Sequence, residues 1–209
     1  MNSIVAATRP NKSKTAIAQE KMMQGTYNTQ GEIRDWTYYD TQRINSTTLS
    51  HSFFTDGIGS PFSDGSANKT FADTNIITKG MPNAQNFNIK AIKVIYKPDE
   101  VRVETEMVAI FDLLAETTFS FKIANKDNTL ELNMLDLMGI NFGVTQAAAV
   151  LGQSPVRSIV SKAYPLNISI PVSALTTYRA NVQHHAAPAA GIVGDKIQIS
   201  LQGFLQSLS

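Results

Sequence analysis

Apolar and polar residues alternate in short runs along most of the chain from residue 34 onward, which is the pattern of half-buried β-strands. Residues of the turn-forming types, Gly, Pro, Asn and Asp, cluster between these runs. The run at 197–201, for example, sets Ile197, Ile199 and Leu201 against polar neighbours. The pattern predicts about eight strands, at residues 34–40, 45–54, 87–96, 119–123, 130–134, 166–170, 178–182 and 197–201.

The longest of these runs, residues 87–96, changes its apolar face partway along. The apolar positions are Phe87, Ile89 and Ala91 in the first half and Ile92, Val94 and Tyr96 in the second. Successive side chains of a strand point to opposite faces, so this shift would expose half of the set unless the strand is irregular. We therefore expect a β-bulge or a sharp bend within this strand.

One segment has the helical period instead. Between residues 100 and 116 apolar side chains recur three and four positions apart, and Asp99 stands where an N-cap residue would lie. About eight strands and one inserted helix predict an all-β protein, folded as a single jelly-roll β-sandwich. Residues 31–209 are expected to form this jelly-roll domain, because a two-layer β architecture often uses such a length as one domain.

Two segments are too polar to belong to such a core. Residues 1–30 hold four basic residues and one acidic residue, so their local charge is about +3. We expect them to form an extended, flexible N-terminal arm, either solvated and frayed or docked on a partner. Residues 55–85 form a long loop rich in Gly and Pro, and loops of this length are usually functional or disordered. In an assembling protein its simplest role is contact between subunits or surface display.

Bulk composition narrows the class of protein. Only 17% of the 209 residues are charged and the formal net charge is +1, while Asn, Gln, Ser and Thr supply most of the polarity. Such faces suit contact between subunits, because burying an unpaired charge is costly. The absence of cysteine excludes disulfides, thiolate zinc sites and cysteine nucleophiles. No apolar run approaches the roughly 20 residues that span a bilayer, and the N-terminus lacks a signal-peptide pattern, so we expect a soluble protein.

No motif of a common active site is complete in this chain. Residues 57–62 begin like the glycine-rich fingerprint of dinucleotide-binding proteins but lack its third glycine and a following helix. Residues 152–156 contain Ser154 after Gly152, without the second glycine of a nucleophile elbow. We expect both segments to be turns and predict no catalytic residue.

The histidines also fail to form a metal-binding pattern. His184 and His185 are adjacent, so on a strand their side chains point to opposite faces and cannot readily hold one ion. Cupin-type metal sites use a His-x-His pair followed by a glutamate, which this chain lacks, and His51 is its one other histidine. We therefore predict no metal and no cofactor, and a polar strand end near a loop at residues 184–185.

Acidic and aromatic residues have simple structural interpretations. Carboxylates near the start of the predicted helix favour the positive end of the helix dipole without any catalytic role; they are Asp99, Glu100, Glu104 and Glu106. A glycosidase would need two carboxylates facing each other across a cleft, which spacing alone does not show. Five aromatic residues could stack on sugars or bases, although core or interface packing is commoner; they are Trp36, Tyr38, Tyr39, Phe53 and Phe54.

Several of these features together resemble a known family. The pair Phe53-Phe54 precedes a polar loop, the motif Thr70-x-x-Asp73-Thr74-Asn75, and a step from Pro82 to Phe87 into a long strand. Later come YPLNISIP at 164–171 and YRANV at 178–182. This order resembles the jelly-roll major capsid proteins of tailless icosahedral bacteriophages, several of which belong to the adenovirus–tectivirus lineage. The likeness covers about residues 45–97 and 160–204.

The resemblance implies a structural virion protein, not an enzyme, that self-assembles into an icosahedral phage shell. Many members carry two tandem jelly rolls, whereas this chain has room for one, so it implies a single-jelly-roll capsid protein or a smaller component such as a vertex protein. The implied partners are copies of itself in trimers or pseudo-hexameric capsomers, other capsid proteins, and an internal membrane or genome reached by the N-terminal arm. The implied location is the virion.

Two other classes stay open on the residues alone. A carbohydrate-binding β-sandwich module or adhesin would use exposed aromatic side chains near one sheet face. An enzyme of hydrolase or cupin type is disfavoured by the missing nucleophile and metal motifs.

Overall fold

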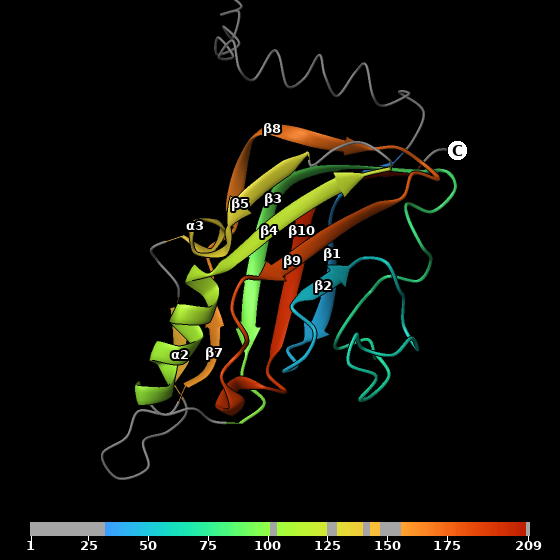
Figure 1. The fold of residues 1–209 in the computed structure, drawn as a ribbon. Coiled ribbons are helices and arrows are strands. Elements are labelled where there is room, and N and C mark those ends of the chain that lie inside the picture. Colours follow the sequence, from blue (N-terminus) through green and yellow to red (C-terminus); the bar gives the residue numbers. More distant parts are fainter. Residues whose placement is uncertain (1–31, 101–103, 125–128, 140–142, 147–155, 208–209) are drawn as a thin grey trace, which may run out of the picture.

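The computed structural model describes residues 32–100, 104–124, 129–139, 143–146 and 156–207, and ten strands in these ranges form two antiparallel sheets (Figure 1). The first sheet has the order β1 (Ile33–Arg43), β10 (Lys196–Ser207), β3 (Gln85–Lys97), β7 (Val156–Val160) and β6 (Gly143–Gln146), and β8 (Tyr164–Val172) also pairs with β3. The second sheet has the order β2 (Ser50–Phe53), β9 (Tyr178–His184), β4 (Thr117–Ile123) and β5 (Leu130–Asn133). The prediction of an all-β protein is confirmed.

The predicted helix is α2 (Glu104–Ala115), inserted between β3 and β4. Residues 101–103 lie outside the described residues, so the predicted cap at Asp99 is not tested. A short second helix, α3 (Met134–Met138), follows β5, because the Asn133 side chain caps it by accepting a hydrogen bond from the Leu135 N–H at 2.9 Å. The strand predicted at 130–134 therefore ends one residue early. A short 3₁₀ helix, η1 (Ala190–Ile192), precedes β10.

The strand prediction at 45–54 was too long, since only β2 is a strand there. Asn45 explains the difference, because its side-chain oxygen accepts hydrogen bonds from the Thr47 N–H and hydroxyl and from the Thr48 N–H, which forms a turn. The other predicted runs each fall in a strand. The predicted N-terminal arm lies outside the described residues, as do residues 152–155.

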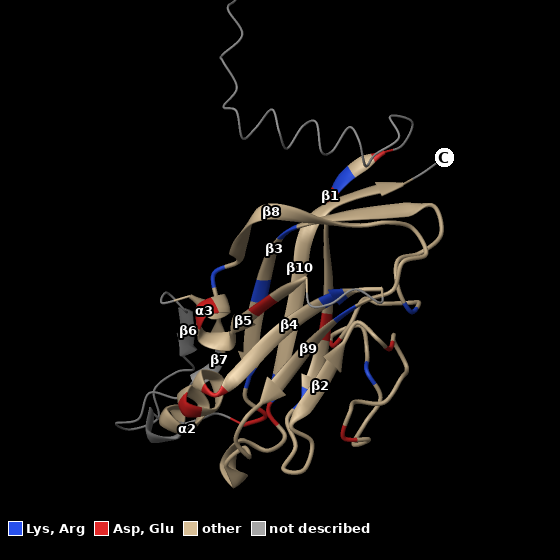
Figure 2. Ribbon diagram, turned by 45° about the horizontal axis from the view of Figure 1, so that its top comes forward, with Lys and Arg blue, Asp and Glu red and all other residues tan. Residues whose placement is uncertain are grey.

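The core lies between the two sheets and is formed by their inward-facing apolar rows. From the first sheet it takes alternate residues of β3 and β10, and from the second sheet those of β4 and β9, while Ile110 and Leu114 of α2 pack against it. Charged side chains are sparse over both sheets (Figure 2). The fully buried aromatic side chains of this core include Phe53, Phe54, Phe87, Tyr96, Phe119 and Phe121.

The expected irregularity in β3 is present. Against β10 the pairing register shifts between Gln202 and Gly203, where Lys90 is an extra residue of β3. Against β8 it shifts between Ile89 and Ala91, where residues 166–169 of β8 lie opposite Lys90 alone. This bulge restores the phase: Phe87 and Ile89 before it and Ile92, Val94 and Tyr96 after it are buried. Ala91, expected on the same face as Phe87 and Ile89, is only half-buried, because the shift occurs at Lys90. It also requires glycine at position 203, because a Cβ there would overlap the carbonyl oxygen of Asn88.

Candidate assembly surfaces

The long loop between β2 and β3, residues 54–84, lies along the free edge of β1 (Figure 1). Asn75 pairs with that edge in the place of a neighbouring strand: its side-chain oxygen accepts the Tyr39 N–H at 2.9 Å, and its amide donates to the Thr37 carbonyl at 2.8 Å. Its own N–H donates to the Tyr39 carbonyl at 3.2 Å. An uncovered edge strand would offer these groups to another chain, so Asn75 directs further contacts away from the middle of β1.

The motif that contains Asn75 begins with a self-contained turn. Both the N–H and the hydroxyl of Thr70 donate to one Asp73 oxygen, at 3.0 and 2.9 Å, and the Lys196 ammonium lies 3.0 Å from the other. Burial acts to raise the pKa of Asp73, but these contacts outweigh burial and the pKa is lowered. The Thr74 hydroxyl then donates to the Tyr39 carbonyl at 3.1 Å. Residues 70–75 thus hold the loop against the edge of β1 by hydrogen bonds.

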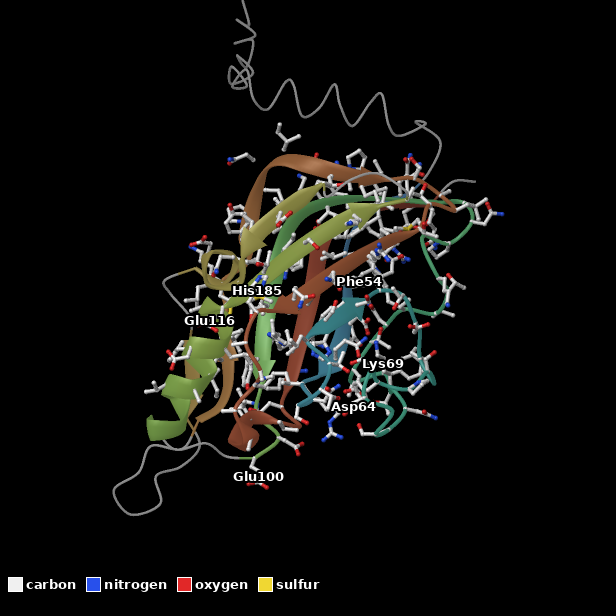
Figure 3. The ribbon with its side chains drawn as sticks, viewed as in Figure 1. Phe54, Asp64, Lys69, Glu100, Glu116 and His185 are labelled. Carbon is white, nitrogen blue, oxygen red and sulfur yellow. The ribbon has the colours of Figure 1, made fainter. Side chains whose placement is uncertain are left out.

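A buried ion pair also holds the loop against β1. The Lys69 ammonium lies 2.8 and 3.0 Å from the two oxygens of Asp40 on β1, and both side chains are fully buried. Figure 3 shows Lys69 in the loop, near Phe54. The backbone N–H groups of Thr41 and Phe54 donate to the same carboxylate at 2.9 and 2.8 Å. Burial raises the pKa of Asp40, and the Lys69 charge opposes that rise. Because Phe54 follows β2 directly, the pair joins both sheets to the loop.

The outer surface of this loop is nearly neutral and bears protruding apolar side chains. Phe71 and Ile77 are 72% and 81% exposed, and Leu175, in the adjacent β8–β9 turn, is 72% exposed. The loop's charged residues are mostly occupied: Lys69 and Asp73 by the contacts above, and Lys79 by Asp56 at 3.4 Å. Exposed apolar groups amid few free charges are the composition of a protein–protein interface. We call this side of the molecule, residues 54–84 with Leu175, the loop face.

A second apolar surface lies where β8 passes over β4 and β5 (Figure 1). A groove of about 520 Å³ opens there, and none of the residues that line it carries a charge. Ile168 in this groove is 69% exposed although its neighbour on the same face of β8, Ile170, is buried. The groove is also lined by Ile123, Leu130, Tyr164 and Leu166.

The structure separates His184 from His185 and brings His184 to His51. His184 is buried, whereas His185 is exposed and its Nε2 lies 2.7 Å from the Thr118 hydroxyl. The rings of His51 and His184 lie 5.3 Å apart between centroids, on the inward side of β2 and β9. One sign of this pair is visible in the sequence, since both positions belong to the apolar rows that hold Phe53 and Val182.

The hydrogen bonds of Thr117 indicate the tautomer of His184. The Thr117 hydroxyl donates to the Leu113 carbonyl at 2.5 Å, so its oxygen accepts from Nδ1 of His184 at 2.8 Å. Burial lowers the pKa of His184 to about 4, helped by the nearby imidazoles of His51 and His185. The pKa of His51 is also lowered by burial. Neither Nε2 atom has a hydrogen-bond partner among the described residues. The residues that the structure describes contain no group of three or more His, Asp or Glu side chains that could hold a metal ion.

The other sequence candidates occupy structural positions. Residues 57–62 form a turn, in which the Ser60 N–H donates to the Gly57 carbonyl at 3.1 Å. The Asp99 N–H donates to the Asp195 carboxylate at 2.8 Å, and the Asp99 side chain lies 3.5 Å from Arg43. Glu104 and Glu106 belong to α2, and the structure does not describe their side chains. Among the aromatic residues, Tyr38, Phe53 and Phe54 are buried and Trp36 is 37% exposed.

No helix among the described residues is both long and apolar enough to cross a membrane. No protein-family model matches the chain, and no curated protein matches it.

Proposed function

We propose that the protein is a structural virion protein, folded as a single jelly roll, that self-assembles into an icosahedral phage shell as a major capsid protein or a closely related capsid component. The observation that carries this proposal is the way in which the strands pair. If β6 and β7 are set aside, eight strands remain in chain order: β1, β2, β3, β4, β5, β8, β9 and β10.

These eight strands pair as a nested set. The first pairs with the last (β1 with β10), the second with the seventh (β2 with β9), the third with the sixth (β3 with β8), and the fourth with the fifth (β4 with β5). A ribbon of four antiparallel strand pairs, rolled so that its pairs divide between two facing sheets, is a jelly roll, the fold of many viral capsid domains. The same fold occurs in lectins and cupins, so the functional step needs surface features as well.

Two surface features favour assembly over these other uses. The loop face presents Phe71, Ile77 and Leu175 from a nearly neutral surface, and the groove under β8 is lined without any charge. Two different apolar surfaces on one subunit suit a heterologous contact, in which one surface of each copy meets the other surface of the next. The buried Lys69–Asp40 pair fixes the loop, so its apolar side chains are presented without a large ordering cost on binding.

Size-exclusion chromatography with light scattering, together with electron microscopy, tests this proposal. We expect the purified protein to form closed particles or capsomers as its concentration rises. The variant Phe71→Ser/Ile77→Ser should form them only at much higher concentration while unfolding at the same temperature, because both side chains are largely exposed in the single subunit. Val193→Ser is the control, since Val193 is partly exposed outside the loop face. A wild-type protein that stays monomeric across concentration and salt would contradict the proposal.

One observation favours the second candidate, a carbohydrate-binding module. Trp36, Asp35 and Gln202 line an open pocket of about 600 Å³, which combines an aromatic ring with polar side chains as sugar sites do. Against it, the Arg34 guanidinium lies over the Trp36 ring at 4.7 Å and covers one ring face. A glycan array would decide: binding that is lost in Trp36→Ala supports the module, and uniform lack of binding excludes it.

A further inference from the structure

Two cations stand directly opposite each other on the outward face of the second sheet. Lys122 of β4 and Arg179 of β9 are register partners, in a position where like charges destabilise a pair of strands. Neither has a hydrogen-bond or ion-pair partner among the described residues. Lys79 lines the same pocket of about 320 Å³. We call Lys122 and Arg179 the basic pair; its repulsion would be relieved by an acidic group from outside the subunit.

A complementary surface lies at the other end of β4. Asp112 lies in the last turn of α2, and Glu116 follows the helix directly, with its N–H donating to the Asp112 carbonyl at 3.1 Å. Both line a groove of about 340 Å³ between α2 and the chain after β9. Neither carboxylate has a side-chain partner among the described residues. The rest of this acidic groove is mostly alanine, which suits the apolar stem of a long basic side chain whose charge reaches the carboxylates; the alanines are Ala109, Ala115, Ala186, Ala187 and Ala189.

The two surfaces cannot meet within one subunit. Glu116 directly precedes β4, and Lys122 lies six positions later on the same extended strand, which places their backbones about 20 Å apart. That separation exceeds the combined reach of the two side chains. Asp112 and Glu116 accordingly lie near the start of β4, whereas Lys122 and Arg179 pair near its other end.

We propose that the basic pair of one copy docks in the acidic groove of the next copy, so that Lys122 and Arg179 bind Asp112 and Glu116 across a heterologous contact. This inference rests on the proposed self-assembly and specifies one of its interfaces. Opposite charges at the two ends of the same sheet set a head-to-tail order, which closes into a ring or shell where the rotation between copies permits. The contact also removes the like-charge repulsion that each free subunit retains.

Charge reversal with rescue tests the contact. Lys122→Glu/Arg179→Glu and Asp112→Lys/Glu116→Lys should each raise the concentration needed for assembly by at least about tenfold, because each places like charges across the interface. The quadruple variant, with both surfaces reversed in one chain, should assemble again. An equimolar mixture of the two double variants should also assemble, since each reversed surface then faces its complement. Lys93→Glu/Lys162→Glu makes the same change in net charge elsewhere and should assemble like the wild type.

The outcomes separate this proposal from the function on which it rests. A wild type that never assembles overturns both. If the wild type assembles and both double charge-reversal variants assemble equally well, only the docking contact is overturned. A defect in the Asp112→Lys/Glu116→Lys variant that the quadruple variant does not rescue also overturns it, and assigns the acidic groove to another basic partner such as residues 1–31. Circular dichroism and thermal unfolding of each variant exclude misfolding as the cause.

Discussion

The Lys69 ammonium lies 2.8 Å and 3.0 Å from the two carboxylate oxygens of Asp40, and neither side chain is exposed. The two residues are 29 positions apart, one in a polar loop and the other in the edge strand β1. Two backbone N–H groups complete the hydrogen bonding of the carboxylate, so both of its oxygens are satisfied despite their burial. Its contribution is to fix the position of the loop that forms the loop face.

Removing one partner should therefore be costly. Lys69→Met leaves the Asp40 carboxylate buried without a counter-charge, and we expect the free energy of unfolding to fall by about 3–5 kcal/mol. Urea unfolding followed by circular dichroism measures this. Lys69→Met/Asp40→Asn is the matched control, because the amide oxygen still accepts a backbone N–H and no charge is left buried. The double variant should be more stable than Lys69→Met. If Lys69→Met lies within about 1 kcal/mol of the wild type, the ion pair does not hold the loop as argued.

Most of the strands could be predicted from the sequence because burial of one sheet face repeats every second residue. The bulge in β3 could be predicted as well, because the alternation of apolar and polar residues shifts by one position within that strand. Lys69 was not predictable, since lysine is almost never buried without a partner and its partner lies in a distant strand. The loop contact of Asn75 with Tyr39 and the meeting of His51 with His184 depend in the same way on sheet pairing, which a local pattern does not contain.

The bulge requires glycine at position 203. A Cβ there would meet the backbone of Asn88 and Ile89, which cannot move without disturbing the pairing of β3 with β10. Gly203→Ala should lower the free energy of unfolding by about 1–3 kcal/mol or more, as overpacking does. Gly191→Ala is the control, because nothing lies within 4 Å of its added Cβ, and its melting temperature should match the wild type. Equal melting temperatures for the two variants would rule out the close approach as the reason for the glycine.

Asn75 should protect the edge of β1. Asn75→Ala removes one acceptor and one donor from the Tyr39 N–H and the Thr37 carbonyl, and we expect a loss of about 1–3 kcal/mol with faster hydrogen exchange at the Tyr39 amide. Asn75→Asp keeps the acceptor but not the donor, so the Tyr39 amide should stay protected. Exposure of this edge should also promote aggregation of the alanine variant. Unchanged exchange at Tyr39 in Asn75→Ala would show that other contacts hold the loop in place.

The last prediction concerns acid. The pKa of His184 is lowered from 6.5 to about 4 in the folded protein, so the unfolded chain takes up a proton more readily than the folded one. The resulting stability is fully present above pH 6.5 and is lost as the pH falls from 6.5 toward 4. The loss approaches about 1.4 kcal/mol per pH unit and totals about 3 kcal/mol for this residue alone. Carboxylates also titrate near the bottom of this range, so the informative quantity is the difference between variants.

Urea unfolding at intervals between pH 7.5 and 4.5 isolates the contribution of His184. His184→Gln loses the titrating group, so its stability should depend less steeply on pH than that of the wild type, whatever the substitution costs at neutral pH. His185→Gln is the comparison variant, because that side chain is exposed on the opposite face and adds less than burial does to the lowered pKa of His184, so it should keep most of the wild-type slope. Because Ser63 in the loop contacts His51 at 3.0 Å, protonation of the pair should loosen the loop face as well. Acid should then weaken assembly before it unfolds the subunit. If particles persist unchanged at pH 5 while His184→Gln still reduces the pH dependence of stability, protonation lowers the stability of the subunit without loosening the loop face.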